Sequence, residues 1–137
     1  MHPGPPRRRG FTLVEMLVAL SLAALLLGLA LPTLRGQELR AARLDAVEAL
    51  TRLQAAQERY RSQHGLYAAD LGALLGAQGT SAQGRYALSL ALVGPEGYDA
   101  TANALGPQSR DGGCSTLTLR VRQGFAETGP DAGCWLR

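Results

Sequence analysis

The sequence has no lysine, few aromatic residues and only two cysteines. All 14 basic side chains other than histidine are arginines, and aromatic residues make up 5% of the chain. A small domain with so few large apolar side chains gains from an additional covalent link. His2 and His64 lie far along the chain from each other and from both cysteines, so the sequence does not predict a zinc site.

The chain also lacks any catalytic constellation that spacing reveals. Asp70, Asp99 and Asp111 have neither a paired base nor a metal-ligand arrangement, and Asp111-Gly112-Gly113 is typical of a turn. The 17 glycines form no phosphate-binding pattern, Ser115 lacks an elbow motif, and no Asn-x-Ser/Thr site exists. The sequence therefore indicates a substrate of enzymes that is not an enzyme itself, with no cofactor and no metal.

A long apolar run follows a basic cluster near the start. Arg7, Arg8 and Arg9 precede Gly10, and residues 11–34 carry one charge, that of Glu15. About 21 residues of this run span roughly 31 Å as a helix, the thickness of a bilayer's hydrocarbon core. The arginines predict a cytoplasmic N-terminus and an exported remainder.

The run contains three residues that a plain membrane anchor does not explain. An isolated carboxylate such as Glu15 is costly in lipid and predicts a functional partner. Gly28 and Pro32 are poor helix formers and predict a kink or a loosened turn. A secretory signal has a shorter apolar core and a small-residue cleavage site, and a simple uncleaved anchor leaves Glu15 without a role. Both remain alternatives.

The order R-R-R-G-F-T-L-V-E-M-L-V-A-L resembles the class III signal of type IV prepilins. The resemblance implies that a prepilin peptidase removes residues 1–10 by cutting between Gly10 and Phe11, and that Phe11 is then N-methylated. Glu15 matches the family's glutamate and Pro32 its mid-helix proline. The resemblance also implies a partner for Glu15, the N-terminal amine of a neighbouring subunit, which would set the axial register of a filament.

Removal of the leader changes the charge balance. The whole chain has a formal charge of +3 and a pI near 9.3. The leader contains three arginines and no acid, so the mature side chains sum to zero. The high pI is therefore no evidence for nucleic-acid binding. The nearly neutral exported part is compatible with close packing of subunits.

The two cysteines, Cys114 and Cys134, both lie late in the exported part. An even number of cysteines in an exported protein predicts a disulfide, although two free thiols remain an alternative. Closing a loop of about 20 residues would contribute about 3 kcal/mol in the chain-entropy model.

The exported part, residues 35–137, predicts an α+β fold. An apolar stripe over residues 35–63 extends the N-terminal helix, although a break between Pro32 and Gly36 is an alternative. The stripe consists of Leu39, Ala42, Ala46, Leu50, Leu53, Ala56 and Tyr60. A loop over 64–84 contains a short apolar turn at 71–75. Strands at 85–93, 98–105 and 115–122 form an antiparallel meander on the stripe. The tail, 123–137, is expected to be a loop tied back by Cys134.

Two further patterns carry a resemblance to pilins. Tyr60-x-x-x-x-Gly65-x-Tyr67 resembles the helix exit of pilins and pseudopilins, with Ala68 in place of a proline. The pattern that runs from Tyr98 through Cys114 to Trp135 resembles the type IVa branch, which includes PilE-like and ComP-like minor pilins. It implies the ladle-shaped pilin fold and an exposed C-terminal disulfide loop. Trp135 is expected to pack over the disulfide.

These observations favour a structural subunit of a type IV pilus-like filament. The expected partners are the prepilin peptidase and methyltransferase, other pilin subunits and the pilus assembly machinery. The precursor is expected in the bacterial inner membrane with its head outside, and the mature protein in an extracellular or periplasmic filament. Whether the subunit is major or minor, and whether it serves adhesion, motility or DNA uptake, stays open.

Two alternatives belong to other classes. A ComP-like pilin that binds DNA would need a basic stripe on the head. The available arginines are Arg85, Arg110, Arg120, Arg122 and Arg137, of which Arg120 and Arg122 share one strand face. A type II secretion pseudopilin is disfavoured by the cysteine pair and by the lack of an acidic calcium loop.

Overall fold

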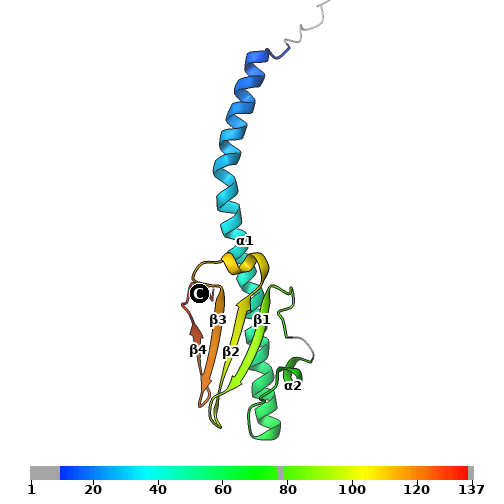
Figure 1. Ribbon diagram of the computed structural model, residues 1–137, viewed down its shortest axis with the longest axis vertical. Coiled ribbons are helices and arrows are strands. Elements are labelled where there is room, and N and C mark those ends of the chain that lie inside the picture. Colours follow the sequence, from blue (N-terminus) through cyan, green and yellow to red (C-terminus); the bar gives the residue numbers. More distant parts are fainter. Residues whose placement is uncertain (1–9, 77–78, 136–137) are drawn as a thin grey trace, which may run out of the picture. The chain divides into compact units, whose positions relative to one another are not determined.

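The computed structural model describes residues 10–76 and 79–135, without the side chains of residues 30–33 and 35. The chain divides into two compact units, Met1–Gly36 and Gln37–Arg137, and we call the second unit the head. Helix α1 (Leu13–His64) is continuous, so the alternative of two helices broken between Pro32 and Gly36 is wrong (Figure 1). The predicted kink at Gly28 and Pro32 stays a prediction.

The head combines the second half of α1 with a four-stranded antiparallel sheet in the order β1-β2-β3-β4 (Figure 1). The strands are β1 (Tyr86–Leu92), β2 (Gly97–Ala104), β3 (Thr116–Arg122) and β4 (Phe125–Gly129). Two short helices, α2 (Leu71–Leu75) and η1 (Gly106–Arg110), lie in the connections. The predicted α+β class is confirmed, and each of the three predicted strands lies within about one residue of its observed position.

The expectation of a loop-like tail after residue 122 is wrong, because Phe125–Gly129 forms β4. The segment has no alternation of apolar and polar residues that would indicate a strand. It pairs because the chain reverses tightly at Gln123 and Gly124, whose φ angles are 51° and 83°. Two positive φ angles in a two-residue loop are the requirement of a type I′ turn, which suits the twist of a hairpin.

The core lies between α1 and the inward face of the sheet. Small and medium side chains of α1 are buried there, which allows the helix to approach the sheet closely. The core residues from α1 include Ala46, Ala49, Leu50 and Leu53, and those from the strands include Tyr86, Tyr98, Leu117, Leu119 and Val121. The strand residues alternate with exposed ones, as expected for a sheet with one solvated face.

Buried polar side chains of α1 hold the connection between α1 and β1. The amide of Gln57 donates to the carbonyl of Ala68 and accepts from the backbone N–H of Ala68, both at 2.9 Å. The buried carboxylate of Asp45 accepts hydrogen bonds from the Ser81 hydroxyl and the Gln83 backbone N–H. These bonds satisfy polar groups that would otherwise be costly to bury.

Candidate functional site

The predicted processing and assembly residues lie at the start of α1. Thr12 precedes the helix, and its Oγ1 accepts a hydrogen bond of 3.3 Å from the backbone N–H of Glu15. Thr12 and Glu15 therefore have the spacing of a capping box, in which a hydroxyl caps the helix and an acid follows three residues later. The Glu15 carboxylate also lies in the first turn, where the helix dipole favours negative charge. Arg7, Arg8 and Arg9 lie outside the described residues.

The N-terminal half of α1 exposes its apolar side chains on every side. Each described side chain from Phe11 to Leu29 is exposed, including Leu13 at 77% and Leu29 at 69%. A surface of this extent on one helix requires a lipid or protein partner. Within the described part of the chain, no helix combines the length and apolarity needed to cross a membrane.

The predicted disulfide between Cys114 and Cys134 is confirmed, with a Cα–Cα distance of 5.4 Å. Both cysteines are buried in the core, next to the start of β3. Trp135 is 5% exposed and donates from its indole nitrogen to the carbonyl of Gly129 at 2.8 Å. It belongs to the same buried cluster as both cysteines, which agrees with a packing role, and its packing over the disulfide itself stays a prediction.

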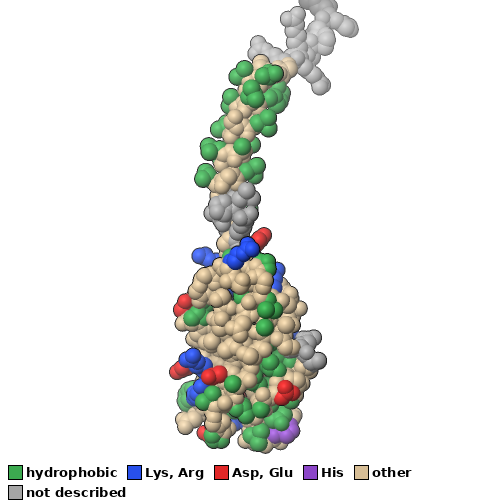
Figure 2. Space-filling view, in the orientation of Figure 1, with side chains coloured by type: hydrophobic (Ala, Val, Ile, Leu, Met, Phe, Trp, Pro, Cys, Tyr) green, Lys and Arg blue, Asp and Glu red, His purple; other side chains and the backbone are tan. Residues whose placement is uncertain are grey.

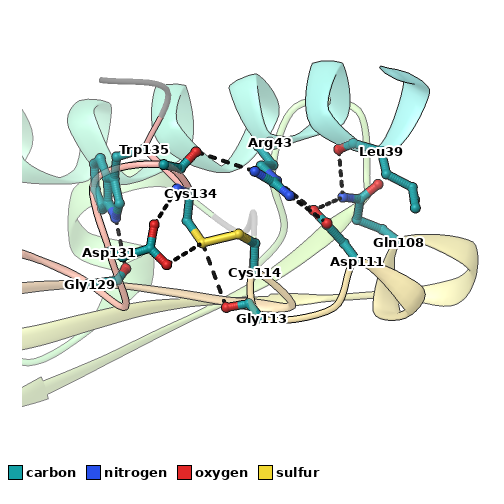
Figure 3. Close-up of a disulfide and its surroundings, with 11 residues drawn as sticks. Leu39, Arg43, Gln108, Asp111, Gly113, Cys114, Gly129, Asp131, Cys134 and Trp135 are labelled. Atoms are coloured by element: carbon teal, nitrogen blue, oxygen red, sulfur yellow. Dashed lines mark hydrogen bonds and ion pairs between the residues drawn. A yellow bond between two sulfur atoms is a disulfide. The ribbon is translucent and has the colours of Figure 1, made fainter. Parts of the chain in front are cut away.

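An ion pair between Arg43 and Asp111 joins α1 to the segment that precedes Cys114 (Figure 3). The Arg43 guanidinium donates to both carboxylate oxygens of Asp111 at 2.7 Å and to the carbonyl of Gly133 at 3.3 Å. Gln108 donates to Asp111 and also to the carbonyl of Leu39. The hydrogen bond to Asp111 raises the pKa of Arg43 above its ordinary value. Arg43 therefore contacts Gly133, which adjoins Cys134, and Asp111, which precedes Cys114 by three residues.

The two arginines of the predicted DNA patch share the outward face of β3. Arg122 pairs with Asp99 at 2.7 Å and also donates to the carbonyl of Tyr98. Arg120 lies opposite Asp99 on β2 and Glu127 on β4. Two acids therefore balance the two arginines, and this face carries no net positive charge.

Two family models match the chain. Residues 5–31 match the prokaryotic N-terminal methylation motif. Residues 32–118 match a family described as "Type IV minor pilin ComP, DNA uptake sequence receptor", which covers more than half of the chain. The chain belongs to this family of type IV minor pilins. No curated protein matches it.

Membership explains several features of this minor pilin. The methylation motif indicates a membrane-anchored precursor that is processed for incorporation into a pilus. The family match makes the subunit a minor one, which the sequence had left open, and disfavours a secretion-system pseudopilin. Pilin families are structural, which agrees with the expectation of a protein that is not an enzyme.

The carboxylates considered for catalysis have structural partners in this pilin. Asp70 caps α2 by accepting from the backbone N–H of Ala73, Asp99 pairs with Arg122, and Asp111 pairs with Arg43. No group of three or more potential metal ligands occurs among the described residues. His64 stacks on Tyr60 with ring centroids 4.0 Å apart, at the end of α1.

Two features were missed from sequence. Thr12 and Glu15 show the threonine and acid spacing of a capping box, so this signal was available. Arg43 and Asp111 are 68 residues apart, and Asp111 sits in a Gly-rich turn, so no local pattern connects them.

Proposed function

We propose that this minor pilin is made as an inner-membrane precursor with its N-terminus inside and its head outside. The prepilin peptidase then cuts between Gly10 and Phe11, and Phe11 is methylated. The match to the methylation motif and the basic cluster before Gly10 support this sequence of events. The membrane step rests on the apolar sequence and on that motif.

The mature subunit enters the pilus through the first half of α1. The observation that carries this proposal is the apolar surface of residues 11–29, which is exposed on all sides of a helix that continues into a folded head. Packing of such helices against one another covers that surface once the subunit leaves the membrane. We expect the disulfide-linked head to remain at the outside of the helical bundle.

Glu15 sets the register of the new subunit by pairing with the N-terminal amine of a neighbour. Two unit charges about 4 Å apart attract by about 4 kcal/mol at an effective dielectric constant of 20. We expect Glu15→Val to leave cutting and methylation intact and to reduce the subunit's abundance in sheared pili at least about ten-fold relative to membranes. The matched control is Glu48→Val, which removes another exposed acid of the same helix, in the head. Equal incorporation of the two variants would refute the role of Glu15.

A second candidate function is DNA capture during uptake, supported by the description of the matched family as a DNA uptake sequence receptor. The outward face of β2–β4 is charge-balanced, so a DNA site built on Arg120 and Arg122 alone has little electrostatic basis. The test is fluorescence anisotropy of a labelled duplex with the full chain in detergent. Binding that weakens steeply between about 50 and 200 mM salt supports this candidate, and absence of binding at the lower salt removes it.

A further inference from the structure

The charges of the head are unevenly distributed. Its described residues include nine arginines and ten acids, a net charge of −1. At the end that contains η1, however, Arg40, Arg85 and Arg110 are exposed, and the structure gives none of these described residues an ion-pair partner. Figure 2 shows basic side chains gathered at this end of the visible face, with acidic atoms beside them.

Backbone and side-chain contacts bring these arginines together. Gln108 donates to the carbonyl of Leu39 at 3.0 Å, so Arg110 on η1 and Arg40 on α1 each lie within two residues of that bond. The carbonyl of Arg85 accepts from the backbone N–H of Leu105, at the same end of the sheet. We call Arg40, Arg85 and Arg110 the basic end.

A groove lies at the basic end, and Arg85 is the member of the basic end that lines it. The groove is lined by Glu38, Leu39, Arg85, Leu105, Pro107 and Gln108. Leu105 is 42% exposed, and Pro107 is exposed beside it. Glu38 is the only acid among these lining residues. Asp111, which is close to the basic end, is paired with Arg43. Asp131 lies near Arg43 and accepts a hydrogen bond from the Cys134 backbone N–H. Its charge lowers the net charge at this end of the head, which stays positive.

We propose that the basic end binds anionic phospholipid headgroups while the precursor waits in the membrane. The proposal rests on the membrane-anchored precursor described above. Arg40 follows the apolar run by six helical residues, about 9 Å. The headgroup layer on each side of a bilayer is about 5–8 Å thick, and an arginine side chain can reach back across the remaining distance. The exposed side chains of Leu105 and Pro107 lie among these arginines and would contact the membrane interface.

A lipid surface suits this end better than a duplex does. Arg40 is six residues along the chain from the apolar run, so the anchor raises the effective concentration of headgroups near it, whereas DNA must be captured from solution. Each arginine near an anionic surface strengthens the association about five-fold, so the three together form an ionic contact that salt weakens. Extraction of the subunit into a pilus would have to break this contact.

The experiment uses the full chain with the substitution Ser109→Cys, at an exposed position of η1. A fluorophore is attached to the thiol introduced at this position. The native cysteines remain in their disulfide. The chain is reconstituted into nanodiscs of phosphatidylcholine, with or without about one-third phosphatidylglycerol, and quenching by a headgroup-attached nitroxide is measured. We expect quenching at least about three-fold stronger in the anionic discs, and loss of this difference at about 0.5 M NaCl.

The test variant is Arg40→Gln/Arg85→Gln/Arg110→Gln, which should abolish the lipid dependence. The matched control, Arg52→Gln/Arg59→Gln/Arg120→Gln, removes the same charge from exposed arginines elsewhere and should retain it. Equal quenching of the unsubstituted head in both kinds of disc overturns the proposal. So does an equal loss of the lipid-dependent quenching in the test variant and the control variant. Binding of a labelled duplex in neutral discs that only the test variant loses would assign the basic end to nucleic acid instead. A chain that fails to co-elute with discs refutes the anchored precursor itself, so the two failures are distinguishable.

Discussion

Replacement of Arg43 by methionine should destabilise the head strongly, because it leaves the Asp111 carboxylate buried without its partner. The side chains of Arg43 and Asp111 are 12% and 6% exposed, and two hydrogen bonds of 2.7 Å join them. Removal of one member of a buried ion pair costs about 3–5 kcal/mol. Gln108 still donates to Asp111 in the variant, so we expect about 3 kcal/mol.

The measurement is urea unfolding of the full chain in mild detergent with the disulfide intact. Trp135, the only tryptophan, is buried beside the disulfide loop and reports unfolding of the head by fluorescence. For a head of about 100 residues the urea dependence is about 2 kcal/mol per molar, so the midpoint should fall by about 1.5 M.

Two further variants make the reasoning refutable. Arg43→Met/Asp111→Leu should be more stable than Arg43→Met alone, because no unpaired buried charge remains. Arg52→Met removes the exposed pair with Glu48, whose N–O distance is 3.9 Å, and should cost at most about 0.5 kcal/mol. If Arg43→Met is no more destabilising than Arg52→Met, the ion pair between Arg43 and Asp111 does not stabilise the head.

Three other perturbations follow from the packing. Burial raises the pKa values of Tyr67, Tyr86 and Tyr98, so their contribution to folding stability should be fully present below the unfolded tyrosine pKa of about 10. Above that pH the free energy of unfolding should fall by at most about 1.4 kcal/mol per pH unit for each tyrosine. Absorbance near 295 nm should show the ionisation of these three tyrosines only as the head unfolds. Gly97→Ala should lower the unfolding midpoint, because a Cβ atom would lie 2.8 Å from the carbonyl oxygens of Val93 and Val121. Cys114→Ser/Cys134→Ser opens a loop of sequence separation 20 and should cost about 3 kcal/mol in urea unfolding, while a loss below 1 kcal/mol would contradict the chain-entropy argument.

The elements predicted correctly are those whose signals lie within one segment. The apolar stripe through Ala46, Leu50 and Leu53 predicted the helix face that the sheet covers. Alternation predicted β1 and β3, and the cysteine count predicted the disulfide. Each signal depends on helical or strand periodicity, or on the chemistry of an exported chain.

The features that were missed depend on partners distant in sequence or on turn geometry. β4 has no strand pattern of its own and forms because a two-residue turn at Gln123 and Gly124 returns it along β3. Arg120 and Arg122 looked like a basic patch because the sequence does not reveal that Asp99 and Glu127 lie opposite them. Cross-strand register decides this charge balance, and register is set by the turns and the buried faces.

The central claim is that the chain is a processed minor subunit built into a pilus through its N-terminal helix. Mass spectrometry of sheared surface pili tests it most directly. The account predicts trace amounts of a mature protein that begins at N-methylated Phe11, with Cys114 and Cys134 oxidised. Recovery of only uncut chains that begin at Met1 or His2, confined to membranes, would contradict it.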